Sequence, residues 1–81
     1  MKVKVAIHHE IEVEVNSTAL EQVDQFWRNT PQKNWNAMPS DLLLKATQDV
    51  EAVTGLPFGD SQAKETIYAV YAEDGEPILE W

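Results

Sequence analysis

Apolar and charged residues alternate along the first 15 positions of the chain, with valines and isoleucines at odd positions and lysines and glutamates at even ones. A period of two is typical of a strand with one buried face. Because the parity continues across residues 8–10, a three-residue hairpin loop there keeps one face apolar. That loop pairs Val5 with Val13 and sets Lys4 opposite Glu14. The alternative is one unbroken strand of about 14 residues, which exceeds the usual roughly 3–10.

Two helices are expected to follow. Thr18 and Glu21 have the spacing of a capping box. The helix that they begin should end near Asn29, shortly before a proline, and carries an apolar stripe of Leu20, Val23, Phe26 and Trp27. Ser40 is the predicted N-cap of the second helix, and Gly55 is placed for the left-handed residue after its end. The stripe of this helix is Leu43, Ala46, Val50 and Val53.

The C-terminal segment predicts a second hairpin, because Asp74-Gly75 is a strong signal for a two-residue turn. This turn pairs Tyr71 with Ile78 and Val70 with Leu79. One face is then expected to be core and holds Tyr68, Val70, Ala72, Pro77, Leu79 and Trp81. The other face holds Ile67, Ala69, Tyr71, Glu73, Glu76, Ile78 and Glu80.

The order β-β-α-α-β-β predicts one α+β domain over residues 1–81. Two hairpins form an antiparallel sheet, and the helix pair packs on one face of it.

Composition narrows the class of protein. The chain has no cysteine, so neither disulfides nor zinc–thiolate sites are expected. No apolar run is long enough for a signal peptide or a membrane span, and we expect a cytoplasmic protein. The net charge is −8, of which residues 37–81 carry −7. This acidity argues against binding nucleic acid or anionic membranes and favours a basic protein partner, although acidity also simply maintains solubility.

No catalytic, metal or cofactor site is expected. His8 and His9 are the only histidines, and neighbouring side chains on a strand point to opposite faces, so they do not readily chelate one ion. We interpret them as solvated residues of the turn. A small metal-dependent enzyme that uses them is the minor alternative. No nucleophile elbow or phosphate-binding glycine loop is evident.

A protein-contact surface is predicted on the C-terminal hairpin. Ile67, Tyr71 and Ile78 would form an apolar spot on the outer sheet face, unless a loop or the other hairpin covers it. The spot would be rimmed by acids, and the full set of candidate contact residues is Trp35, Ile67, Tyr71, Glu73, Asp74, Glu76, Ile78 and Glu80. Trp35 lies in a polar loop, where it either folds back as a lid on the core or stays exposed as an interface anchor.

The stretch from Ile11 to about Val53 resembles a small family of uncharacterised proteins from bacteria and their phages. The acidic-apolar strand, the threonine-led cap and the helix sequence Leu-Glu-Gln-Val-Asp-Gln-Phe-Trp at 20–27 carry the resemblance. It implies a setting rather than an activity, namely an accessory protein of a phage or mobile element. The leading hypothesis is a small acidic module that binds and inhibits a host protein complex, as anti-CRISPR and other anti-defence proteins do. A homodimeric structural domain is the alternative.

Overall fold

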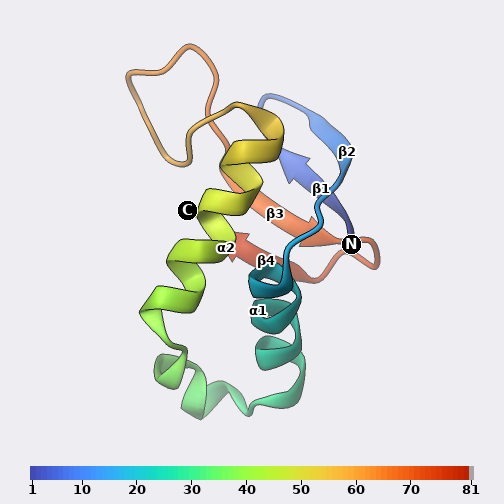
Figure 1. Ribbon diagram of the computed structural model, residues 1–81, viewed down its shortest axis with the longest axis vertical. Helices are drawn as coiled ribbons and strands as arrows, with labels where there is room; N and C mark the ends of the chain where they lie inside the picture. Colours follow the sequence, from blue (N-terminus) through green and yellow to red (C-terminus); the bar gives the residue numbers. More distant parts are fainter. Residues whose placement is uncertain (81) are drawn as a thin grey trace.

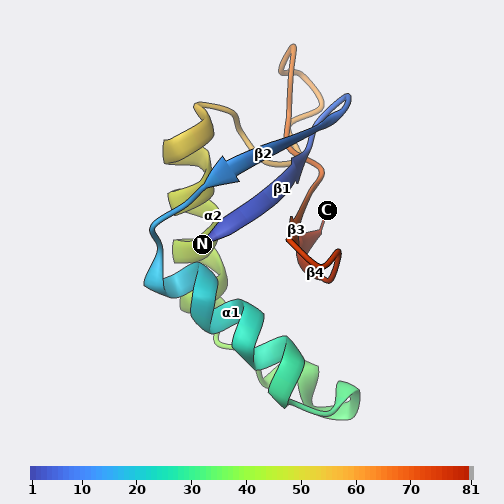
Figure 2. The same cartoon turned by 90° about the vertical axis from the view of Figure 1, so that its right-hand side faces the viewer.

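The computed structural model describes residues 1–80 and confirms the predicted fold. The elements are β1 (Lys2–Ala6), β2 (Glu10–Glu14), α1 (Thr18–Asn29), the 3-10 helix η1 (Gln32–Ala37), α2 (Ser40–Thr54), β3 (Ala69–Ala72) and β4 (Pro77–Glu80). The strands form one antiparallel sheet in the order β2-β1-β3-β4, beside which the two helices lie (Figures 1 and 2). No helix within these residues is long and apolar enough to cross a membrane.

The N-terminal segment is a hairpin, not one long strand, and its register differs from the prediction. The loop is residues 7–9, so Lys4 lies opposite Glu12 rather than Glu14. Both registers keep every odd-numbered side chain on the same face, because the shift of each residue's partner is two positions. Burial alone therefore does not distinguish them. Val15 lies beyond the end of β2, but it remains buried and its N–H donates to the Met1 carbonyl at 2.8 Å.

Both helices begin one residue from the predicted place. Ser17, not Thr18, is the N-cap of α1, and its Oγ accepts the backbone N–H three residues ahead at 3.0 Å. Ser40 is the first residue of α2 rather than its cap, and no side chain caps this helix. The ends agree with the prediction: α1 ends at its expected residue, and Gly55 follows α2 with φ of 70°, a conformation in which a Cβ is unfavourable.

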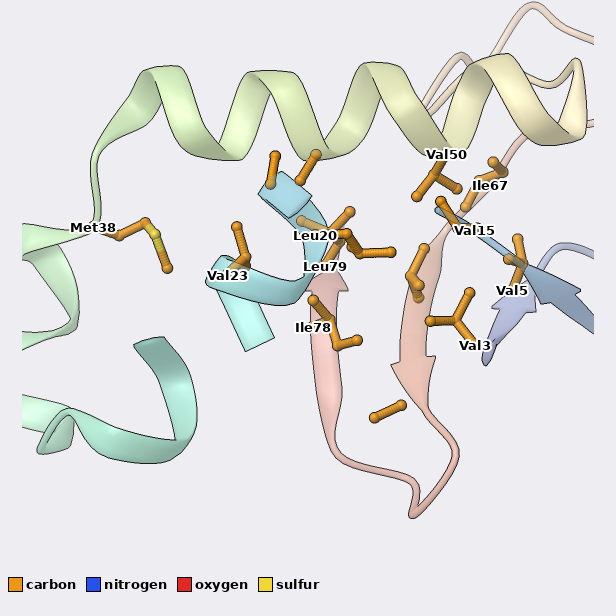
Figure 3. Packing of buried hydrophobic residues seen from close by; sticks show 14 residues of the cluster. Val3, Val5, Val15, Leu20, Val23, Met38, Val50, Ile67, Ile78 and Leu79 are labelled. Carbon is orange, nitrogen blue, oxygen red and sulfur yellow. The ribbon is translucent and has the colours of Figure 1, made fainter. Parts of the chain in front are cut away.

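The core lies between α2, α1 and the inner face of the sheet (Figure 3). Ala46 and Val50 of the predicted α2 stripe are buried and Leu43 is partly buried, but Val53 is 49% exposed. Thr47 takes the remaining buried position, and its hydroxyl donates to the Leu43 carbonyl at 2.8 Å. A threonine is tolerated inside this stripe because the helix backbone satisfies its hydroxyl.

Strand β4 contains an irregularity that overturns part of the predicted face assignment. Val70 pairs with Leu79 as expected, but Tyr71 pairs with Pro77 rather than Ile78. Ile78 is therefore an extra residue in the ladder, as in a β-bulge. A bulge places two consecutive side chains on one side, and both Ile78 and Leu79 are buried in the core.

The predicted apolar spot on the outer face is accordingly wrong. Ile78 is buried by the bulge, and Ile67 is fully buried where it bridges Phe58 in parallel orientation. Conversely, alternation predicts that Tyr68 and Pro77 lie in the core, but both are exposed. Trp81, also assigned to the core, lies outside the described residues.

Candidate functional site

A groove of about 370 Å³ lies between the C-terminal half of α1, η1 and β4. Its volume falls within the range of roughly 300–1,000 Å³ that is typical of ligand pockets. We refer to it as the tryptophan groove; its lining residues are Asp24, Trp27, Arg28, Trp35, Glu76, Pro77, Ile78 and Glu80. Four of the predicted contact residues thus meet in one place, namely Trp35, Glu76, Ile78 and Glu80.

Trp27 joins α1 to the edge of the sheet. Its Nε1 donates a hydrogen bond of 2.8 Å to the Ile78 carbonyl, at the irregularity in β4. The indole also meets Phe26 edge to face, with ring centroids 5.6 Å apart. Such pairs contribute about 0.5–1.5 kcal/mol beyond the area that they bury. Trp27 is therefore a structural support of the groove as well as part of its lining.

Trp35 packs on Trp27 with one part of its ring and leaves another part exposed to solvent. It comes from η1, and its ring centroid lies 5.3 Å from that of Trp27 with an interplanar angle of 67°. Its Nε1 donates to the Thr30 carbonyl at 2.9 Å, and 40% of the residue remains exposed. The two interpretations of Trp35 from the sequence, a ring folded back on the molecule and an exposed anchor, are therefore compatible.

Arg28 fastens the β3–β4 turn to α1. Its Nε bonds Asp24 at 2.9 Å, and its two terminal nitrogens hold both carboxylate oxygens of Asp74 at 2.9 and 3.0 Å. These bonds raise the pKa of Arg28, and they lower the pKa of Asp74 to about 2. The Asp74 carboxylate is thus already occupied by the chain's own guanidinium. Asp24 and Arg28 were not identified from the sequence, although their i,i+4 spacing on a helix is a recognisable signal.

The groove is acidic at its rim. Glu76 and Glu80 are exposed, and within residues 1–80 neither carboxylate has an ion-pair partner. The other predicted contact residues are not brought to the groove. Tyr71 lies on the outer sheet face, where it pairs with Lys4, and Glu73 lines a separate shallow pocket beside the N-terminus.

A polar network ties the two helices together elsewhere. Ser17 Oγ donates to Asp49 at 2.7 Å, and Lys45 donates to the same carboxylate at 2.9 Å. These bonds lower the pKa of Asp49. Because the Ser17 hydroxyl also caps α1, its hydrogen-bonding capacity is used structurally, and we assign the network no chemistry.

The histidines lie near the tip of the first hairpin, where His8 and His9 are exposed. Among the described residues, no cluster of His, Cys, Asp and Glu side chains has the size and arrangement to hold a metal ion.

Comparison of the chain with protein-family models, with curated proteins and with solved structures finds no match. The resemblance to phage-borne proteins therefore stays a prediction, and the groove is the feature of the structure that bears on function.

Proposed function

We propose that this chain is a protein-binding module whose tryptophan groove receives a lysine- or arginine-bearing segment of a basic partner. The observation that carries the proposal is the meeting of two indole rings with the carboxylates of Glu76 and Glu80, neither of which has an ion-pair partner within residues 1–80, at one groove. Aromatic faces attract cations, and carboxylates complement their charge.

The hydrogen bonding of the two tryptophans favours a ligand that contacts the ring faces over one that needs the indole N–H groups as donors. Both indole N–H groups are already donated within the chain, to the carbonyls of Ile78 and Thr30. What the rings still offer is apolar and π surface. An arginine or lysine side chain suits this surface, because its aliphatic stem packs on a ring while its charged end reaches the acidic rim.

The energies involved require a partner larger than one side chain. A cation over an exposed ring contributes about 0.5–1 kcal/mol, and an exposed ion pair about 0.2–1 kcal/mol. A stable complex generally buries about 1,200–2,000 Å² in total. The groove is therefore proposed as the anchor of a wider contact that includes the acidic hairpin around Glu73. The net charge of −8 would speed the encounter with a basic surface.

The role that we propose for such binding is occupation of a host protein surface, in the manner of an anti-defence inhibitor. The phage setting rests on the resemblance between Ile11 and Val53 alone. The homodimer alternative had two grounds, an exposed apolar outer face and pairing of edge strands. The burial of Ile67 and Ile78 removes the first of them.

The experiment compares two double variants of equal net charge. Glu76→Gln with Glu80→Gln removes the rim charges, whereas Glu21→Gln with Glu65→Gln removes two exposed charges that do not line the groove. Binding of a capped arginine–glycine peptide is measured by calorimetry. We expect the rim variant to weaken binding by about 2- to 30-fold, which corresponds to two exposed ion pairs. Equal weakening by both variants would mean that only net charge matters, and would refute the groove.

A further inference from the structure

The outer edge of β2 is the open edge of the sheet. β2 is the end strand in the order β2-β1-β3-β4, and Figure 1 shows no described segment on its outer side. The opposite end of the sheet is different. There, Trp27 donates to the Ile78 carbonyl, and Pro77 has no N–H to offer. An incoming strand therefore finds a continuous row of backbone groups on β2 and an interrupted one on β4.

The ladder shows which backbone groups face this open edge. Met1 and Val15 exchange two backbone hydrogen bonds, of 2.8 and 3.1 Å, so they are a hydrogen-bonded pair. Hydrogen-bonded and non-hydrogen-bonded pairs alternate in an antiparallel ladder. The odd-numbered residues of β2 therefore direct their backbone groups toward β1. The N–H and C=O groups of Glu10, Glu12 and Glu14 point the other way, to the open edge.

The side chains of β2 add a charge pattern to this edge. Its three glutamates alternate with Ile11 and Val13, which are only partly buried against the core. β1 shows what pairs with such a strand, because it alternates lysine and valine and sets Lys2 and Lys4 opposite Glu14 and Glu12. Within residues 1–80, the only ion pair to a β2 glutamate is the one from the Met1 amino group to Glu14, at 3.4 Å.

We propose that the open edge of β2 accepts an extended segment of a partner protein in which lysine or arginine alternates with apolar residues. The segment becomes a fifth strand. Its basic residues lie opposite the glutamates on the outer face, where cross-strand pairs of opposite charge are favourable. Its apolar residues face inward and cover Ile11 and Val13. The added strand thus pairs with the free edge of β2 in the way that β1 pairs with its other edge, with basic residues opposite the glutamates.

A second copy of this chain does not suit the edge. Antiparallel pairing of two β2 strands sets the glutamates of one copy directly opposite those of the other on the same face of the joined sheet. Like charges in such positions are destabilising. Charged side chains on edge strands commonly prevent such self-association. The same charges favour a basic strand, so the occupant is a foreign segment. This inference concerns a different surface from the tryptophan groove and does not depend on it.

The first test uses a capped peptide of about seven residues that alternates lysine and valine, titrated into the full chain and followed by amide NMR. We expect the amides of Glu10, Glu12 and Glu14 to shift and to become protected from exchange with solvent. Two N-methylated peptides then decide the geometry. If the peptide pairs antiparallel to β2, as all strands of the sheet do with their neighbours, the amide of the central lysine faces β2, and its methylation is expected to weaken binding by about tenfold or more. Methylation of the adjacent valine amide, which faces solvent, leaves affinity changed by less than about twofold.

The second test changes the protein at one position. Glu12→Pro removes an N–H that faces the open edge and bonds nothing in β1, so the hairpin is expected to survive while peptide binding is lost. Glu12→Gln retains the N–H and serves as the matched control, with only the loss of one ion pair. If circular dichroism shows that Glu12→Pro does not fold, the two methylated peptides still test strand pairing at the β2 edge with the unchanged protein.

The inference is overturned if the peptide leaves the β2 amides unchanged, or if both methylated peptides bind equally well. Shifts confined to the indole N–H signals of Trp27 and Trp35 would also overturn it, while they would support the tryptophan groove. Protection of the β2 amides without any effect at the indoles would support the edge and leave the groove to its own test.

Discussion

Trp27 is the residue on which the geometry of the groove depends, and Trp27→Phe tests this directly. The substitution keeps an aromatic ring beside Phe26 and Trp35 but removes the Nε1–H that bonds the Ile78 carbonyl at 2.8 Å. This is the only side-chain hydrogen bond between α1 and strand β4 among the described residues. Its loss should loosen the attachment of the sheet edge to the helix.

The expected cost follows from two terms. A hydrogen bond contributes a net of about 0.5–1.5 kcal/mol, and the smaller ring gives up part of two aromatic contacts worth about 0.5–1.5 kcal/mol each. Together they predict a loss of about 1–2 kcal/mol in the free energy of unfolding. For a chain of 81 residues, whose total stability is of the order of 4–12 kcal/mol, this loss is large. It corresponds to a Tm lower by about 4–16 °C.

The assay is urea and thermal denaturation followed by far-ultraviolet circular dichroism, because the substitution removes a fluorophore. Trp35→Phe is the matched control, since it also removes an indole N–H, but one bonded to the carbonyl of Thr30 only five residues away and exposed to solvent. Because this control gives up part of only one aromatic contact, we expect it to cost less than about 1 kcal/mol, below the loss expected for Trp27→Phe. Equal effects of the two substitutions, or no effect of Trp27→Phe, would refute the role given to the Trp27–Ile78 bond.

Three further predictions concern stability. Ile78→Ala should cost about 2–5 kcal/mol in urea denaturation because the side chain is buried, and a loss below about 0.5 kcal/mol would place it outside the core. Ser17→Ala should cost at least about 0.5–2 kcal/mol, because it removes the cap and also the hydrogen bond to Asp49, whereas Thr18→Ala should be nearly neutral. A larger cost for Thr18→Ala would instead support the predicted capping box. Arg28 lowers the pKa of Asp74 to about 2, so the stabilisation by this pair is complete above the unfolded-state pKa of about 3.9 and is lost as the pH falls toward 2. Thermal scans should therefore show a decline over that window that is smaller in Arg28→Gln, and equal declines would contradict the pair's contribution.

The alternation of the first strands predicts faces well and register poorly. Any even shift of the partner leaves Val3 and Val5 buried, so hydrophobicity does not distinguish a loop at residues 7–9 from one at 8–10. No glycine, asparagine or aspartate marks either turn. In the observed register the Ile7 N–H donates to the His9 carbonyl within the turn, and Val15 pairs with Met1 beyond the end of the strand. The alternation of the sequence contains neither contact.

The face of Ile78 was not predictable from local pattern, because strict alternation assigns it to the outer side. The irregularity in β4 accompanies a hydrogen bond from Trp27, 51 residues earlier in the chain. The burial of Ile67 has a related cause. Alternation places it on the outer face of a regular strand, but it lies before β3 and bridges Phe58 in the preceding loop.

The candidate site was predictable in its components and not in its assembly. The acidic hairpin and the unusual Trp35 are visible in the sequence. Their meeting depends on η1, which turns Trp35 back onto Trp27, and on the clamp between Arg28 and Asp74, which are 46 residues apart. Contacts of this kind depend on how α1 docks against the second hairpin, and no local pattern contains that information.

The claim that a cationic segment binds in the tryptophan groove is tested most directly by an NMR titration of the full chain with a capped arginine–glycine peptide, observing the three indole N–H signals and the backbone amides. We expect the indole signals of Trp27 and Trp35 to shift together with the amides of Glu76 and Glu80, and these shifts to disappear when citrulline replaces arginine. Shifts distributed over the acidic surface without a preference for the groove, or an equal response to the citrulline peptide, would contradict it.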